Sequence, residues 1–150
     1  MILHNLRSEE NVGSLFRTAD AFGVEKIYLT GYTPAPIDRF KRPVSKIAKT
    51  ALGAERIVPW EQGSVAAVIS ALKSERVRIL ALEQDVRSVA LHAYQRPARV
   101  AVVLGNEVEG IDAATLALCD DVVHIPMRGT KESLNVAVAG GVALYTLTSG

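Results

Sequence analysis

The sequence predicts an α/β domain with a mostly parallel sheet flanked by helices. Short β-rich apolar runs alternate along the chain with longer segments whose apolar residues recur at helical spacing. The chain has 150 residues, of which 49% are hydrophobic and 22% charged, which is enough to bury the core of one domain. Val77 to Glu83 and Val100 to Gly105 are nearly continuous apolar runs, as in strands covered on both faces, so we expect them to be central.

Six runs are strand candidates because they are short, apolar and rich in β-branched residues. They are Met1 to His4, Lys26 to Thr30, Arg56 to Val58, Val77 to Glu83, Val100 to Gly105 and Val122 to Ile125.

Five segments between these runs have helical spacing: Val12 to Phe22, Ser45 to Leu52, Ser64 to Ser74, Ala113 to Leu118 and Leu134 to Leu147. In the first, the apolar residues Val12, Leu15, Phe16 and Ala19 share one face. In the last, Ser133 is the expected N-cap and nearly every following residue is apolar, as in a buried or interface helix. Gly140 and Gly141 each lower the stability of this helix by about 1 kcal/mol. Close packing of the helix against another backbone would explain why glycine is present there.

The composition excludes several classes of protein. One cysteine, Cys119, excludes a disulfide framework and a cysteine-based zinc site, and favours a reducing cytoplasm. No apolar run approaches the roughly 18 residues of a membrane span, so no membrane partner is expected. The net charge of +1 does not favour any particular class of partner. Without a linker or a composition shift, we expect residues 1–150 to form a single domain with no separate N-terminal RNA-binding domain.

Three polar, glycine-bearing stretches adjoin apolar elements: residues 11–19, 104–110 and 125–136. The last two follow strand candidates, and ligands of open α/β sheets bind beyond the carboxyl ends of strands. Each stretch also has a purely structural interpretation. Asn11 can be a helix cap with Arg17 solvated, Glu107 can lie in a solvated loop, and Ser133 and Asn135 are common at helix starts for local reasons. No phosphate-binding glycine loop is present, which disfavours nucleotide cofactors with phosphates.

Together, the three stretches resemble the signature motifs of the SpoU (TrmH-like) family of RNA ribose 2'-O-methyltransferases, in the SPOUT superfamily. The first is Asn11-x-Gly13-x-x-x-Arg17-Thr18-Ala19, and the second is Leu104-Gly105-x-Glu107-x-x-Gly110. The third is Ile125-Pro126-Met127-x-Gly129-x-x-x-Ser133-Leu134-Asn135-Val136. One departure is Ala137, where many members carry a second serine; the loss of one hydroxyl puts little in doubt.

The resemblance implies a methyltransferase domain with a deep C-terminal trefoil knot, working as a homodimer. It also implies that S-adenosylmethionine is the cofactor, held in the knot largely by main-chain groups. The implied cofactor-binding residues are Leu82, Glu83, Gly105, Asn106, Gly110, Ile125, Met127, Gly129, Ser133 and Leu134.

The implied reaction is attack by a ribose 2'-oxygen on the cofactor's methyl group. The implied catalytic residues are Arg17, Asn11, Glu107, Ser133 and Asn135. A guanidinium stays protonated in proteins, so we expect Arg17 to remain a cation that grips the adjacent phosphate and stabilises the developing oxyanion, not to act as a base. Glu107 is expected either to pair with Arg17 or to accept a proton. No metal is expected, since the three histidines have no ligand spacing.

RNA binding requires a positive surface, and residues 37–56 contain six basic residues against two acidic ones. The candidate RNA contacts are Arg39, Lys41, Arg42, Lys46, Lys49, Arg128 and Lys131. A solvated face is the simpler interpretation of such a run. DNA is excluded as a substrate because the reacting group is the 2'-hydroxyl, and tRNA is expected in preference to rRNA. Two alternatives are a catalytically silent, knotted RNA-binding dimer and an unrelated nucleotide-binding regulatory domain.

Overall fold

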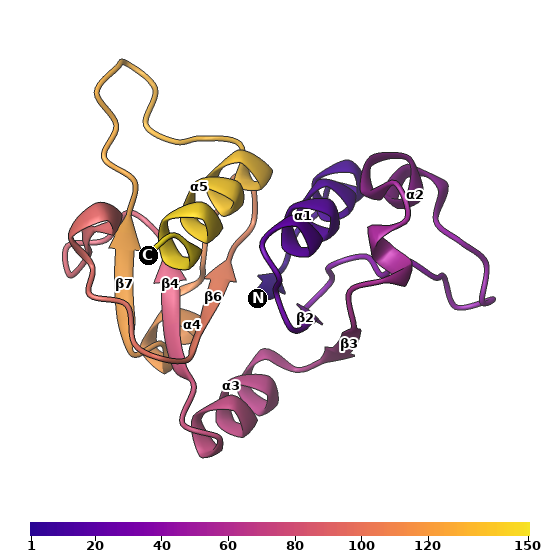
Figure 1. The fold of residues 1–150 in the computed structure, drawn as a ribbon, viewed down its shortest axis with the longest axis horizontal. Helices are drawn as coiled ribbons and strands as arrows, with labels where there is room; N and C mark the ends of the chain where they lie inside the picture. Colours follow the sequence, from indigo (N-terminus) through magenta and orange to yellow (C-terminus); the bar gives the residue numbers. More distant parts are fainter.

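A computed structural model describes all 150 residues as one seven-stranded sheet in the order β3-β2-β1-β6-β4-β7-β5 (Figure 1). Every neighbouring pair of strands is parallel. The strands are β1 (Ile2–His4), β2 (Ile27–Thr30), β3 (Trp60–Gly63), β4 (Arg78–Leu82), β5 (Val89–Ala90), β6 (Val100–Leu104) and β7 (Asp121–His124). The predicted α/β class with a parallel sheet is therefore confirmed.

The centre of the sheet is where the apolar runs predicted it. Strand β6 lies between β1 and β4, and β4 lies between β6 and β7. Residues that alternate along these strands face opposite layers of the molecule, so both faces must be apolar. Leu80 belongs to one hydrophobic cluster, whereas its neighbours Ile79 and Ala81 belong to the other.

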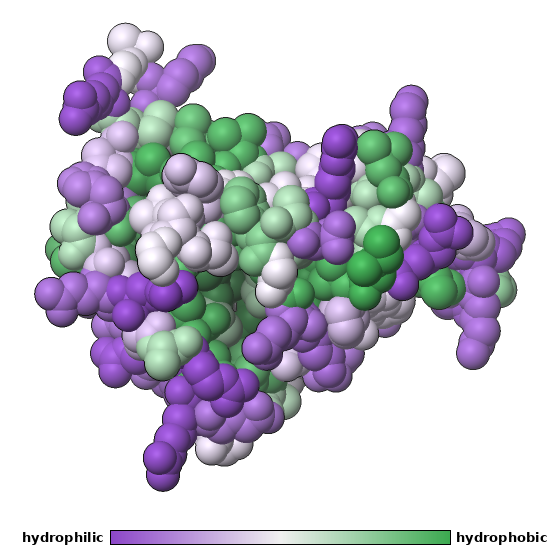
Figure 2. Space-filling view, in the orientation of Figure 1, coloured by the Kyte–Doolittle hydropathy of each residue, from purple (hydrophilic) through white to green (hydrophobic).

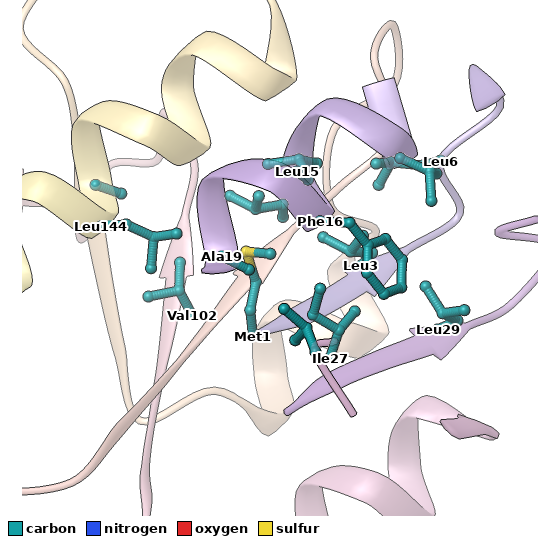
Figure 3. Packing of buried hydrophobic residues seen from close by; sticks show 14 of the residues in the cluster. Met1, Leu3, Leu6, Leu15, Phe16, Ala19, Ile27, Leu29, Val102 and Leu144 are labelled. Carbon is teal, nitrogen blue, oxygen red and sulfur yellow. The ribbon is translucent and has the colours of Figure 1, made fainter. Parts of the chain in front are cut away.

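Helices cover both faces of the sheet (Figure 1). They are α1 (Glu9–Ala21), α2 (Ser45–Ala51), α3 (Val65–Ser74), α4 (Ala113–Leu118) and α5 (Val136–Thr148), with short 3-10 helices η1 (Ala54–Arg56) and η2 (Leu91–Ala93). The larger cluster joins the sheet to α1, α2 and α5, and the smaller one joins it to α3 and α4. Figure 3 shows Leu15, Phe16 and Ala19 of α1 packed over Leu3, Ile27 and Leu29 of the strands. None of these helices has both the length and the apolar character needed to cross a membrane.

Two glycines of the predicted helices mark close packing. A Cβ on Gly13 of α1 would overlap the side-chain oxygen of Thr50 and the carbonyl oxygen of Ile47, so α1 and α2 touch through their backbones at this point. A Cβ on Gly140 of α5 would lie 2.6 Å from Cδ2 of Leu15 and 2.9 Å from Cδ1 of Leu104. Gly140 is therefore required by close packing, but against side chains and not, as expected, against another backbone.

Three local predictions were wrong. Arg56 to Val58 is not a strand: Arg56 is the last residue of the 3-10 helix η1, and the strand that pairs with β2 begins at Trp60. Three of the four residues of this edge strand are exposed, so no apolar pattern indicated it. Ser133 does not cap α5, since Asn135 accepts hydrogen bonds from the amides of Ala137 and Val138. Asn11 is not a cap either, because Ser8 caps α1 and places Asn11 inside its first turn.

Candidate active site

A cleft of about 200 Å³ lies at the carboxyl ends of β4, β6 and β7. Three parallel strands end there together, which is where open α/β sheets bind ligands. Most of the residues predicted to bind a cofactor line this cleft: Leu82, Glu83, Gly105, Asn106, Gly110, Ile125, Met127, Ser133 and Leu134. Gly129 does not line it and lies in the exposed part of the loop before α5. Glu109, Glu132 and Val108 also line it, and nothing in the sequence pattern distinguished them.

The floor of the cleft is a tight loop after β6. The amide of Asn106 donates to the carbonyl of Gly110, and the amide of Gly110 donates to the carbonyl of Asn106, both at 3.0 Å. The Glu83 carboxylate, at the end of β4, accepts from the amide of Ile111 at 2.8 Å. Gly110 has a φ of +71°, and a Cβ there would overlap this carboxylate. The second motif therefore needs glycine at this position for both conformation and space.

The strand order reverses between β1 and β6, and Asn106 links the loops that follow these two strands. Its side chain is buried and donates at 3.0 Å to the carbonyl oxygen of Asn5 and to the hydroxyl of Tyr32. Its oxygen accepts from the amides of Val108 and Glu109 at 2.8 Å each. Tyr32 follows β2 and was missed in the sequence, although it adjoins the same edge of the sheet.

A chain of hydrogen bonds joins all three motifs beside the cleft, which Glu107 lines and Asn11 and Asn135 do not. Asn135, at the start of α5, donates to the side-chain oxygen of Asn11 at 3.2 Å. Asn11 donates in turn to Oε1 of Glu107 at 3.4 Å. Asn135 and Asn11 are 124 positions apart in the sequence, and Asn11 and Glu107 are 96 positions apart. Only the fold brings them together.

Glu107 holds the segment that leads into α1. Its carboxylate accepts from the amides of Arg7 and Ser8 at 3.0 Å, besides the side chain of Asn11. Burial by itself would raise the pKa of Glu107, but these hydrogen bonds outweigh it and hold the pKa below the ordinary value of 4.5. No hydrogen bond or ion pair joins it to Arg17. The expected Glu107–Arg17 pair is thus absent from this structure, and a carboxylate with a lowered pKa is a poor proton acceptor.

Glu107 should therefore contribute to stability in a pH-dependent way. Because its folded pKa is lowered, the contribution is complete above the ordinary pKa and is lost as the pH falls through the folded pKa. We expect Glu107→Gln to lower the free energy of unfolding by about 1 kcal/mol at neutral pH. The deficit should shrink below the ordinary pKa, as measured by urea unfolding at several pH values.

Glu109→Gln is the matched control, since Glu109 lies in the same loop and its carboxylate accepts no hydrogen bond. It should leave the free energy of unfolding unchanged at every pH. A Glu107→Gln deficit that does not vary with pH would contradict this assignment.

Arg17 takes no part in the hydrogen-bonded chain of Asn135, Asn11 and Glu107. It is exposed on α1, forms no ion pair and does not line the cleft. Its neighbour Thr18 faces Gly141 of α5, with 3.7 Å from Cγ2 to a Cβ built on that glycine. Arg17 therefore lies beside the contact between α1 and α5, outside the cleft of its own chain.

The charge of the cleft discriminates between ligand classes. Four carboxylates line it, those of Glu83, Glu107, Glu109 and Glu132, and no lysine or arginine does. Such a site attracts a cationic ligand and repels phosphates. The cleft therefore disfavours a phosphate-bearing nucleotide.

The predicted RNA contacts lie elsewhere on the surface. Lys46 and Lys49 are on α2, Arg39, Lys41 and Arg42 are on the loop before it, and Arg128 and Lys131 are on the loop before α5. All seven are exposed. Asp38 neutralises one of them by pairing with Arg42 at 3.0 Å.

Comparison with known proteins agrees with this arrangement. The family model described as the SpoU rRNA Methylase family matches residues 1–145. The chain belongs to this family. The resemblance drawn from the three motifs is thereby confirmed.

The curated relatives of this SpoU domain include enzymes named for ribosomal RNA. The 23S rRNA (guanosine-2'-O-)-methyltransferase RlmB of Neisseria meningitidis is 34% identical over 145 residues, which are 96% of this chain and 55% of the relative. The protein of the same name from Coxiella burnetii is 32% identical over 97% of this chain and 56% of the relative. The chain thus spans about half the length of these relatives.

Solved structures of SpoU-type proteins share the fold. The AdoMet-bound rRNA methyltransferase from Sinorhizobium meliloti is 26% identical, with a TM-score of 0.86 over 97% of this chain and 54% of that chain. A structure described for 2-OH methylation of C/U34 on tRNA is 28% identical, with a TM-score of 0.80 over 97% of this chain and 91% of that chain.

Proposed function

We propose that this chain catalyses S-adenosylmethionine-dependent methylation of ribose 2'-hydroxyls in RNA. The observation that carries the proposal is the hydrogen-bonded chain Asn135–Asn11–Glu107, which gathers the three family motifs beside one cleft. A silent RNA-binding protein has no need for this arrangement. The names of the relatives support the same activity.

The cleft fits S-adenosylmethionine. The cofactor carries a sulfonium cation, which suits a site lined by four carboxylates and no lysine or arginine. Leu82, Ile125 and Leu134 offer apolar side chains to the flat adenine, and the loops around them offer main-chain groups for its edge. Bound there, the cofactor supplies an activated methyl group.

The remaining chemistry concerns the ribose oxygen, which is a weak nucleophile until its proton leaves. Arg17 remains a cation, holds the neighbouring phosphate and stabilises the negative charge that develops on the oxygen. Asn11 and Asn135 orient the ribose. Glu107 acts by holding the segment before α1 against the cleft, and Ser133 lies at the cleft wall where it meets the substrate.

We infer that the working form is a homodimer in which Arg17 serves the partner's cleft. Four exposed apolar side chains follow one face at and beyond the start of α5: Leu134, Val138, Val142 and Tyr145, exposed by 39%, 53%, 38% and 63%. A second copy of this chain is the natural cover for such a stripe. Arg17 lies beside the contact between α1 and α5, so a twofold pairing across this face carries it toward the other subunit.

A charge on this face should separate the subunits. Val142→Asp is expected to convert the dimer to a monomer, measured by light scattering, and to abolish methyl transfer while the circular dichroism spectrum stays unchanged. Ile57→Asp, at an exposed apolar residue outside α5, is the control. A Val142→Asp protein that remains dimeric and active contradicts the proposed interface.

We also propose that the C-terminal segment forms the trefoil knot of the family. Strand β7 lies between β4 and β5, which are joined directly by residues 83–88. The chain that leaves β7 must pass this connection before α5 reaches α1 and η2. The connection over residues 83–88 contains no helix, and threading of the chain under it is consistent with this order.

Ribosomal RNA is the first substrate to test. The preference for tRNA expected from the sequence finds no support in the curated relatives, which are named as 23S rRNA enzymes. The experiment measures methyl transfer from labelled S-adenosylmethionine to unmodified 23S rRNA and, separately, to unmodified tRNA. Incorporation into rRNA supports the proposal. Incorporation into neither RNA, by a protein that binds the cofactor, favours the silent RNA-binding alternative.

A further inference from the structure

The loop between β2 and α2 carries a small, well-defined hairpin, residues 37–43. Its ends meet in an antiparallel bridge between Ile37 and Pro43, and the amide of Asp38 donates to the carbonyl of Arg42 at 2.9 Å. The Asp38 carboxylate closes the turn by accepting from the amide of Phe40 at 2.8 Å and from that of Arg42 at 3.0 Å. The hairpin is therefore held in shape by its own hydrogen bonds.

The tip of the hairpin presents an aromatic ring to solvent. Phe40 is 61% exposed, which is unusual for a phenylalanine outside a binding surface. The guanidinium carbons of Arg39 and Arg42 lie 4.7 Å and 4.9 Å from the ring centroid. Figure 2 shows hydrophobic surface enclosed by hydrophilic residues at the end of the molecule where this loop projects.

The two arginines differ in freedom. Arg42 is fixed by its ion pair with Asp38 at 3.0 Å. Arg39 forms no hydrogen bond or ion pair through its side chain and is free to turn toward an anion. A stacking ring beside one fixed and one free guanidinium suits a planar ring attached to phosphates, because bases stack on aromatic and guanidinium planes.

The charge of the hairpin favours RNA over a protein partner. Three cations, Arg39, Lys41 and Arg42, stand against the single carboxylate of Asp38. The exposed apolar surface is limited to Phe40 and Ile37, whereas protein docking needs a larger contiguous apolar area. The surface therefore fits one base and its adjoining phosphates.

A shallow groove lies where the segment leading into α1 faces the loop between β2 and α2. Two basic residues, Arg7 and Lys46, and two acidic ones, Glu9 and Glu10, line this groove together with Ser8, Tyr32 and Pro34. Tyr32 accepts the hydrogen bond from Asn106 at the cleft floor. Arg7 donates its amide to Glu107 and leaves its side chain without an acceptor. Tyr32 and Pro34 belong to the loop between β2 and α2, which also carries Phe40.

We propose that the hairpin of residues 37–43 binds an unpaired base of the RNA substrate, with Phe40 stacking on the base and Arg39 contacting its phosphate. The inference rests on the proposed function and adds a requirement for the substrate. The RNA must carry a single-stranded segment some distance from the methylated ribose. A base within a duplex cannot stack on Phe40, since its neighbours cover both of its faces.

The test uses a labelled RNA hairpin with an unpaired purine loop and the same stem closed into a continuous duplex. Phe40→Leu should weaken binding of the looped RNA about 10-fold, since base–aromatic stacking contributes on this scale. Phe40→Trp should restore the affinity. Binding of the duplex should be the same for all three proteins. Arg39→Gln should weaken looped-RNA binding and reduce its salt dependence, whereas Arg76→Gln, at the other end of the sheet, should do neither.

A second readout detects the stacking itself. In a Trp60→Phe background, which removes the one natural tryptophan, the fluorescence of Phe40→Trp should be quenched by the looped RNA and not by the duplex. Equal looped-RNA affinity of wild type and Phe40→Leu, or an equal loss for the duplex, overturns the inference. Methyl transfer by wild type separates the two proposals: its absence counts against the proposed function, while Phe40-dependent binding still supports the hairpin.

Discussion

Arg17→Ala is expected to lower the rate of methyl transfer by about 100- to 1,000-fold, as does removal of one group that stabilises a developing oxyanion in other enzymes. The affinity for S-adenosylmethionine should not change, because Arg17 is assigned to the RNA phosphate and the ribose oxygen and not to the cofactor. The measurements are single-turnover rates at saturating RNA and cofactor titration by calorimetry. A loss of cofactor affinity equal to the loss of rate would contradict the role assigned to Arg17.

Arg17→Lys distinguishes a cation from a base. If the side chain acts as a cation, the lysine variant keeps partial activity that does not recover at high pH. A rate that rises steeply with pH and reaches that of the wild type once the lysine deprotonates supports the base role instead.

Mixed dimers test which subunit supplies Arg17. Arg17→Ala and Asn135→Ala proteins, each inactive alone, should regain about a quarter of wild-type activity when mixed and allowed to exchange subunits. This follows because half of the dimers are mixed and each mixed dimer has one intact site if Arg17 acts across the interface. No recovery in mixed dimers shows that Arg17 acts within its own chain.

Gly13→Ala is expected to destabilise the fold by about 1–3 kcal/mol or more, as overpacking does when the obstructing atoms cannot move aside. The added Cβ would meet the backbone of α2 at Ile47 and the hydroxyl of Thr50, which is itself held by a hydrogen bond to the carbonyl of Glu10 at 3.0 Å. The free energy of unfolding in urea measures the effect.

Gly141→Ala is the matched control in another helix. Its Cβ would meet nothing nearer than Cγ2 of Thr18 at 3.7 Å, so the change should stabilise the helix by about 0.5–1 kcal/mol. A neutral Gly13→Ala would show that the contact between α1 and α2 is looser than the structure gives. The glycine of the first motif therefore serves the fold that presents Asn11, and not the chemistry.

The sequence predicted a helix or strand best where its buried residues form a regular pattern along the chain. The helix over Val12 to Phe22 was predictable because its apolar residues share one face, and β4 and β6 because both of their faces are buried. Strand β3 was missed because it is an exposed edge strand held by main-chain hydrogen bonds to β2, which leave no apolar pattern. The two-residue strand β5 is too short for any pattern.

The candidate site was predictable as a set of motifs and not as a geometry. Spacing alone gave Asn11, Glu107 and Asn135 ordinary structural interpretations, and only the resemblance joined them. The hydrogen bonds between them depend on contacts across 124 and 96 residues, which no local pattern encodes. A pair with Arg17 was one of two expected roles of Glu107, and in this structure two backbone amides, which every residue carries, occupy its carboxylate instead.

The proposed function requires that the chain methylates the ribose and not the base. It is tested most directly by nucleoside analysis of RNA treated with the protein and labelled S-adenosylmethionine. Complete digestion followed by mass spectrometry should place the added methyl on the ribose fragment, and the modified linkage should resist alkaline cleavage. A methyl group found on the base fragment, with the linkage still cleaved by alkali, would contradict the account.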